Sequence, residues 1–198
     1  SMAWPDGEAR RVVYVQASDG AYAGAIVTAP DIALLGSGVA IPGFGGKAFG
    51  GGARPLVRGT GEGIRVNASA DGTAIAGFEI TTDGGGTGIF SGSGKVQVVD
   101  NVIRDNQRGV LLLSDGEFDS IIEGNRLADN AMAGLQIEAT GGAGESFRLA
   151  VEDNVFEGGA QGFWGMAEGH EGDGARIAGN TVRDTDDLGL WFRMAAGD

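Results

Sequence analysis

Two tryptophans stand at equivalent places in the sequence, because each is the second residue after a glycine in Gly162-Phe163-Trp164 and Gly189-Leu190-Trp191. Glu138 and Arg193 follow similar glycine-headed segments. Exposed indole rings cover the apolar faces of sugar rings, while carboxylate, amide and guanidinium groups bind the hydroxyls. If the fold brings these residues to one face, they form a carbohydrate-binding surface.

The other candidate ligand-binding residues occupy comparable places after a glycine, where side chains are expected to point outward. The whole set comprises Arg65, Phe90, Gln136, Glu138, Trp164, Trp191 and Arg193. Trp164 and Trp191 are expected to be neighbours with their ring faces toward solvent, and burying half of one indole would contribute about 2 kcal/mol to binding. The alternative is that a long loop or a partner chain covers these aromatic side chains.

The single histidine of the chain, His170, lies in the acidic segment 168–173. A histidine with flanking carboxylates beside a groove can act as a general base or bind a metal ion. The alternative is a solvated acidic loop without a chemical role. Glu138, His170 and Arg193 are the candidate catalytic residues, but the sequence contains no complete catalytic motif.

Two aspartates, Asp105 and Asp129, are expected to stack in consecutive coils of the chain, with Asp184 two coils further. Carboxylates about 5 Å apart can recruit a cation such as Ca²⁺. The alternative is a pair of exposed acids whose repulsion is weak in water. Ca²⁺ is therefore the one cofactor that the sequence suggests.

These positions derive from a repeat in which a glycine opens a short segment of alternating apolar residues. The segments begin at Gly63, Gly88, Gly109, Gly134, Gly162 and Gly189, so their intervals are 25, 21, 25, 28 and 27 residues. A second mark, an asparagine with an apolar residue two positions later, runs in step with the first and comprises Asn101, Asn125, Asn154 and Asn180. A single coil cannot bury its apolar face alone, so the coils must stack and equivalent strands must pair.

Alternation along each strand predicts three inward columns of apolar side chains. They are Val98, Ile122, Val151 and Ile177; Ile103, Leu127, Phe156 and Val182; and Val110, Leu135, Phe163 and Leu190. The asparagines are expected to adopt the left-handed backbone at a sharp bend and to form a hydrogen-bonded ladder. The predicted fold class is all-β, a right-handed parallel β-helix of about seven coils with three strands per coil.

Two other architectures were compared with this repeat. A fold of alternating strands and helices needs helical segments of ten or more residues, and none with helical periodicity is found. A propeller or sandwich needs antiparallel hairpins with Asn-Gly or Asp-Gly turns at regular spacing, which the sequence lacks.

The glycine and asparagine marks resemble the "N-x-I…G-I" repeat of the pectate-lyase-like superfamily. The resemblance covers residues 12–194, and residues 13–38 are similar to the first coil of such proteins. It implies an extracellular or cell-surface setting and carbohydrate as the ligand class. If the chain is an enzyme, the resemblance implies a polysaccharide lyase, hydrolase or epimerase. The calcium-and-arginine signature of true pectate lyases is absent, which argues against lyase activity.

Composition narrows the range of partners. The formal net charge is −13, from 27 acidic and 14 basic residues, and such a surface repels nucleic-acid phosphates and anionic lipid. No apolar run reaches the about 20 residues of a membrane span. Glycine supplies 39 of the 198 residues while apolar residues reach 42%, which favours many short strands with tight turns over a disordered linker.

Residues 1–11 are expected to be a tag remnant and N-terminal lead-in, residues 12–194 a single β-helix domain, and residues 195–198 a tail at a truncation point. A solenoid exposes apolar core and unpaired strands at its two ends. We therefore expect the domain to continue in a longer chain or to associate end to end with another chain. Two functions remain open: a carbohydrate-binding or carbohydrate-processing domain, or a non-catalytic stalk or adhesin segment of a larger surface protein.

Overall fold

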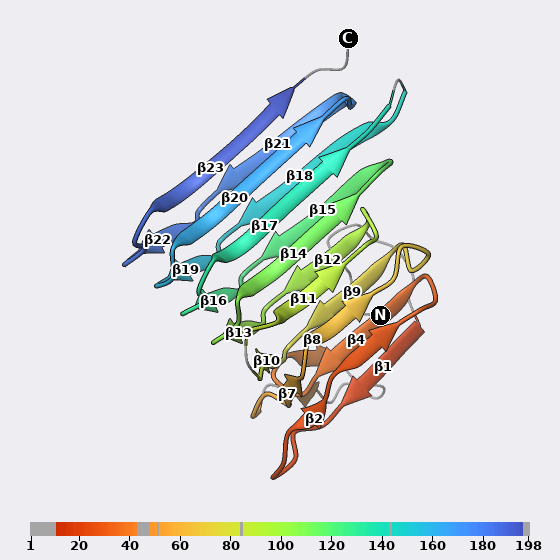
Figure 1. Cartoon of the computed structure of the whole chain (residues 1–198). Helices are drawn as coiled ribbons and strands as arrows, with labels where there is room; N and C mark the ends of the chain where they lie inside the picture. Colours follow the sequence, from red (N-terminus) through yellow and green to blue (C-terminus); the bar gives the residue numbers. More distant parts are fainter. Residues whose placement is uncertain (1–10, 43–47, 51, 84, 143, 196–198) are drawn as a thin grey trace.

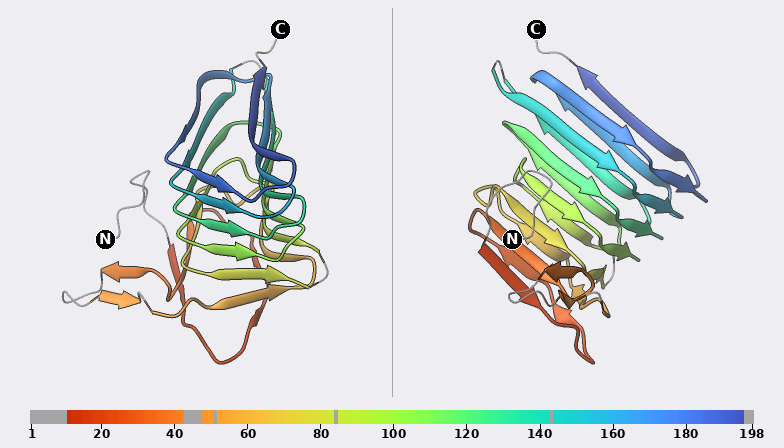
Figure 2. Two further views of the ribbon diagram at one scale, coloured as in Figure 1. Left: turned by 90° about the vertical axis from the view of Figure 1, so that its left-hand side faces the viewer. Right: turned by 180° about the vertical axis from the view of Figure 1, so that it is seen from behind.

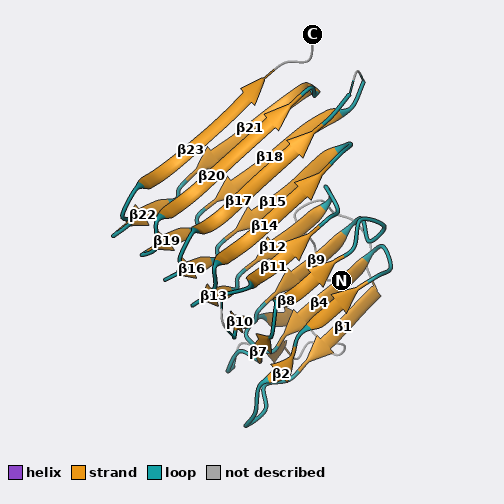
Figure 3. Ribbon diagram, viewed as in Figure 1, coloured by secondary structure: helices purple, strands orange, loops and turns teal. Residues whose placement is uncertain are grey.

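The computed structural model describes residues 11–42, 48–50, 52–83, 85–142 and 144–195. This part of the chain contains 23 strands and no helix (Figure 3). The strands follow one another around a winding chain, and equivalent strands stack side by side into an elongated solenoid (Figure 1). Residues 1–10 of the expected lead-in and residues 196–198 of the expected tail lie outside the described residues.

Three sheets of seven strands each form the walls of the solenoid. Sheet A contains β1 (Arg11–Val15), β4 (Ile32–Gly36), β9 (Thr73–Ala76), β12 (Val96–Val99), β15 (Phe118–Glu123), β18 (Ser146–Glu152) and β21 (Glu171–Ala178). Sheet B contains β2 (Tyr22–Ala23), β7 (Leu56–Gly59), β10 (Glu79–Thr82), β13 (Val102–Arg104), β16 (Arg126–Ala128), β19 (Val155–Glu157) and β22 (Thr181–Arg183). Sheet C contains β3 (Ala25–Val27), β8 (Glu62–Val66), β11 (Thr87–Ser91), β14 (Arg108–Ser114), β17 (Ala133–Thr140), β20 (Gln161–Glu168) and β23 (Leu188–Ala195).

Each coil contributes one strand to each sheet, and neighbouring strands within a sheet are parallel. The five coils from β9 to β23 are uninterrupted. In the coil before them, an antiparallel hairpin of β5 (Ala40–Pro42) and β6 (Ala48–Gly50) separates β4 from β7 and projects from the side of the solenoid (Figure 2). The predicted parallel β-solenoid with three strands per coil is confirmed.

The hydrophobic core fills the interior of the winding chain, and strand register confirms all three predicted inward columns. Their members from Val98 to Phe163 are at most 1% exposed. Burying one such side chain contributes about 1.5–3 kcal/mol, so the aligned columns are the main source of stability. In the last described coil the same columns open to solvent, where Leu190 is 44% exposed.

The four marked asparagines form a hydrogen-bonded ladder at the bend between sheets A and B. The Oδ1 atom of Asn125 accepts the main-chain N–H of Asn101 at 3.0 Å, and Asn154 does the same for Asn125 at 2.9 Å. The amide nitrogen of Asn125 donates to the Val98 carbonyl at 2.7 Å. Because these groups are buried, each amide satisfies main-chain groups that water cannot reach.

A second ladder, which the repeat did not reveal, lies at the bend between sheets B and C. Nδ2 of Asn106 donates to Oδ1 of Asn130 at 2.9 Å. The hydroxyl of Thr82 extends the ladder by donating to Oδ1 of Asn106 at 3.0 Å. Both asparagines are buried, so two of the three bends carry buried amides that link consecutive coils.

The left-handed backbone belongs to the residue before each ladder asparagine. Positive φ angles occur at Asp100, Gly124, Asp153 and Gly179 in the first ladder, and at Asp105 and Asp129 in the second. The prediction that the asparagines adopt this backbone was therefore wrong. An amide that bonds to both neighbouring coils must point inward, so the sharp bend falls to the residue before it, where aspartate or glycine tolerates positive φ.

A small second core lies on the outward side of sheet A, which simple alternation would assign to solvent. Ala33 and Leu35 of β4 pack with Ala74 and Ala76 of β9, and all four are at most 1% exposed. Val39, from the segment that leads toward the hairpin, packs with them. The insertion between β4 and β7 therefore protects a patch of the outer wall.

We expect Asn125→Ala to lower the free energy of unfolding by about 3 kcal/mol, because the Asn101 N–H and the Val98 carbonyl would lose partners in a buried site. Asn180→Ala should cost less, because Asn180 is only half-buried in the last coil. Urea unfolding of both variants measures the difference. Equal small losses would mean that the ladder does not hold the coils together.

Candidate functional site

Seven residues point outward in one register row across sheet C, which we call the outer row. Strand pairing aligns them in consecutive coils as Ile26, Arg65, Phe90, Leu111, Gln136, Trp164 and Trp191. Parallel strands lie about 4.8 Å apart, so the row is a continuous strip perpendicular to the strands. Five of the seven predicted ligand-binding residues therefore lie side by side, and Ile26 adds a position from the irregular first coil.

Trp164 and Trp191 form the aromatic end of the outer row. Their ring centroids are 5.5 Å apart and their planes differ by 16°, which is an offset stack. The two facing ring surfaces therefore cover each other, and both residues are half-buried. The expectation that both rings turn their faces to solvent is thus modified, because a shared stack leaves the outer ring surfaces and the ring edges for contact with a ligand.

A polar network lies directly beside the tryptophans. Gln136 precedes Trp164 in the outer row, and its Oε1 accepts a hydrogen bond from Nε of Arg108 at 2.6 Å. Its Nε2 donates to Oε1 of Glu138 at 2.6 Å. These two bonds fix the orientation of the Gln136 amide and hold an exposed carboxylate next to the rings.

Arg108 was missed by the sequence repeat, although a signal existed. It is the residue before a repeat glycine, and alternation places that position outward beside the outer row. Among the described residues Arg108 forms no ion pair with a carboxylate, so its guanidinium is oriented by Gln136 and Gln107 alone.

The second outward column is shorter in functional groups. Leu113, Glu138, Met166 and Arg193 are aligned in consecutive coils, so Met166 separates the predicted residues Glu138 and Arg193. Both of these are exposed. They flank the tryptophans from the same side of the row, as expected, without an ion pair between them.

The opposite end of the outer row is engaged in its own contacts. The guanidinium of Arg65 lies over the Phe90 ring, 4.7 Å from its centroid, and also forms an ion pair with Glu62 at 2.7 Å. A hollow of about 400 Å³ lies beside Arg65 and is lined also by Ile26 and Arg58. The ring and the cation there satisfy each other, so the tryptophan end is the freer part of the row.

His170 lies inside the loop layer and is only 8% exposed. Its Nε2 is 3.0 Å from the carbonyl oxygen of Gly116, two coils away, and its ring contacts the edge of Phe147 at a centroid distance of 5.3 Å. Its Nδ1 is buried and has no hydrogen-bond partner among the described residues. A Cβ on Gly141 would come within 2.5 Å of the ring, so the neighbouring loop must have a glycine here. This environment is neither the expected groove nor a solvated loop.

The predicted Ca²⁺ candidates are adjacent but isolated. Asp105 and Asp129 follow paired positions of β13 and β16, and Gly158 takes the equivalent place before Asp184. Asp105 forms an ion pair with Arg104. Within the described ranges, no three acidic, histidine or cysteine side chains gather closely enough to hold a metal ion.

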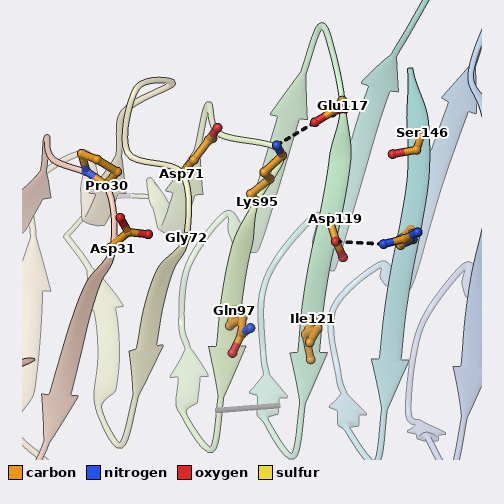
Figure 4. Close-up of a pocket in the computed structure, with 11 residues that line it drawn as sticks. Pro30, Asp31, Asp71, Gly72, Lys95, Gln97, Glu117, Asp119, Ile121 and Ser146 are labelled. Atoms are coloured by element: carbon orange, nitrogen blue, oxygen red, sulfur yellow. Dashed lines mark hydrogen bonds and ion pairs between the residues drawn. The ribbon is translucent and has the colours of Figure 1, made fainter. Parts of the chain in front are cut away.

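A larger hollow of about 850 Å³ lies on the outer side of sheet A and was not predicted (Figure 4). One register row crosses it, with Lys95, Asp119 and Arg148 in consecutive coils. Lys95 donates to Glu117 at 2.7 Å, and this hydrogen bond raises the pKa of Lys95 and lowers the pKa of Glu117. Its charged lining differs sharply from the aromatic row on sheet C.

Comparison with known proteins identifies the fold family. A family model described as the right-handed β-helix region matches residues 57–197, which is more than half of the chain. The chain belongs to the right-handed β-helix family. No curated protein and no solved structure matches this β-helix significantly. In the described part of the β-helix, no helix is long and apolar enough to span a membrane.

The geometry brings together one part of the predicted site and separates the rest. Gln136, Glu138, Trp164, Trp191 and Arg193 share the C-terminal half of sheet C. His170 lies beyond the strand ends, in the loop layer between sheets C and A. The β-helix therefore offers a binding surface made of rings, an amide and a carboxylate, with the histidine outside it.

We expect His170→Ala to lower the free energy of unfolding by about 2 kcal/mol, because it leaves a cavity beside Phe147 and removes the bond to Gly116. His170→Phe should cost less, because it keeps a ring in the aromatic contact. Chemical unfolding of both variants tests this. If neither changed stability, the histidine would not have the packing role that its burial indicates.

Proposed function

We propose that the outer face of sheet C is a glycan-binding surface centred on Trp164 and Trp191. The observation that carries this proposal is the offset indole stack with an oriented amide and carboxylate one strand away. Sugar rings present apolar C–H faces and equatorial hydroxyls, so they need aromatic surface and polar groups together. The proposal is for binding, and it assigns no catalytic step.

The contrast between the three outer faces supports this choice. On sheet B, Arg126 and Arg183 both pair with Glu157, and on sheet A the charges pair as Lys95 with Glu117. Such exposed ion pairs are already hydrated and contribute little to binding a neutral ligand. Sheet C instead displays half-buried rings, whose remaining exposed surface gains free energy when a ligand removes it from water.

The extent of the surface predicts a ligand that spans more than one sugar. Gln136, Trp164 and Trp191 occupy three consecutive coils, so their side chains follow the long axis of the β-helix over about 10 Å. Arg193 and Glu138 lie along one side of this strip. An oligosaccharide aligned with the solenoid axis would contact all of them. The family resemblance places such a ligand in an extracellular or cell-surface setting, which is part of this proposal.

We expect the purified chain to bind at least one oligosaccharide class on a glycan array. Trp164→Ala and Trp191→Ala should each weaken the binding about 30-fold, because losing half an indole of contact costs about 2 kcal/mol. Gln136→Ala should weaken it as well, through loss of the oriented amide. Titration calorimetry with the best array ligand measures these changes.

Ile121→Ala is the matched control, since Ile121 points outward on sheet A and should leave glycan affinity unchanged. Absence of any glycan ligand for the folded wild-type chain would contradict the proposal. The alternative function, a stalk or adhesin segment in which the coils supply only length, would then account for the chain.

A further inference from the structure

The exposed large hydrophobic residues of the described chain are concentrated at the two ends of the solenoid. Nine such residues are exposed, and five of them lie in the first coil, namely Val12, Val13, Tyr14, Tyr22 and Ile26. Three more, Leu188, Leu190 and Met194, lie in β23 of the last coil. Only Met132 lies between the ends. Apolar exposure of this kind marks an interaction surface when it is clustered.

The register of the sheets shows that the two ends are complementary. Every inward column begins with an apolar residue in the first coil and ends with one in the last. If a second copy continued the stack in register, the aligned residues would be Val13 with Ile177, Tyr22 with Val182, Ala25 with Leu190, and Val27 with Phe192. The small Ala25 would meet the large Leu190, and Val27 would meet Phe192.

The main chain sets the same requirement. Within the described strands, β1, β2 and β3 each have one unpaired edge at one end, and β21, β22 and β23 have theirs at the other. A partner that pairs with all three edges at once must offer three parallel strands in the same order around a triangular coil. The first coil of another copy offers this arrangement.

We infer that this β-helix binds a second copy of itself head to tail, with the first coil of one copy stacked on the last coil of the next. The contact is heterologous, so each copy keeps one free end and the association is open-ended. Stacking in register would also place Ile26, which is 67% exposed, beside Trp191 and extend the outer row from one copy to the next. This inference stands independently of glycan binding.

Two blocked variants test the inference. Val13→Lys with Ile26→Lys places charges in the first coil, and Leu188→Lys with Leu190→Lys places them in the last, where stacking would bury them without partners. Met132→Lys is the matched control, because it removes the exposed large hydrophobic residue that lies outside the end coils. Circular dichroism and thermal unfolding verify that each variant is folded, and Leu188→Lys alone replaces the last-coil variant if the double substitution unfolds it.

Sedimentation velocity over a concentration series measures the association. We expect the wild type and Met132→Lys to form species that grow beyond dimers, and each blocked variant to remain monomeric alone. An equimolar mixture of the two blocked variants should form a heterodimer and nothing larger, because it contains one intact interface. A wild type that stays monomeric at every concentration, a blocked variant that dimerises alone, or a mixture that stays monomeric would overturn the inference.

Discussion

The register between successive coils is the constraint on which the rest of this structure depends. Main-chain pairing alone would permit neighbouring strands to slip, and a slip by one residue would turn every core column outward. The buried amides prevent this, because Asn125 bonds to main-chain groups of its own coil and of the coils on both sides. The asparagine ladders therefore fix in one step the core, the outer rows and the complementary shape of the two ends.

The same register gives the three walls their different characters. Side chains at equivalent positions lie about one strand spacing apart, so opposite charges in consecutive coils pair and like residues stack. On sheets A and B this produces ion pairs such as Lys95 with Glu117 and Arg126 with Glu157, which offset repulsion in a chain of net charge −13. On sheet C it produces the stack of Trp164 on Trp191. One geometric rule thus separates a charged exterior from an aromatic strip.

The sequence predicted what depends on short-range alternation and missed what depends on contacts between coils. The glycine and asparagine marks predicted the solenoid, the inward columns and the proximity of Trp164 and Trp191. They could not show that His170 is buried, because its partner Gly116 lies in a loop two coils away. Nor could they show which residue makes the bend, or that Arg108 orients Gln136, since such contacts depend on backbone angles and side-chain conformers.

Disulfide trapping tests the register most directly, because the chain contains no cysteine. Leu113 and Glu138 are paired positions of β14 and β17 with outward side chains, so their Cα atoms are about 4.8 Å apart, within the range of a disulfide. The account predicts that Leu113→Cys with Glu138→Cys forms an intramolecular disulfide under mild oxidation, detected by mass spectrometry. Leu113→Cys with Ile137→Cys should not, because Ile137 points into the core. The reverse pattern, or no disulfide in the first pair, would contradict the register.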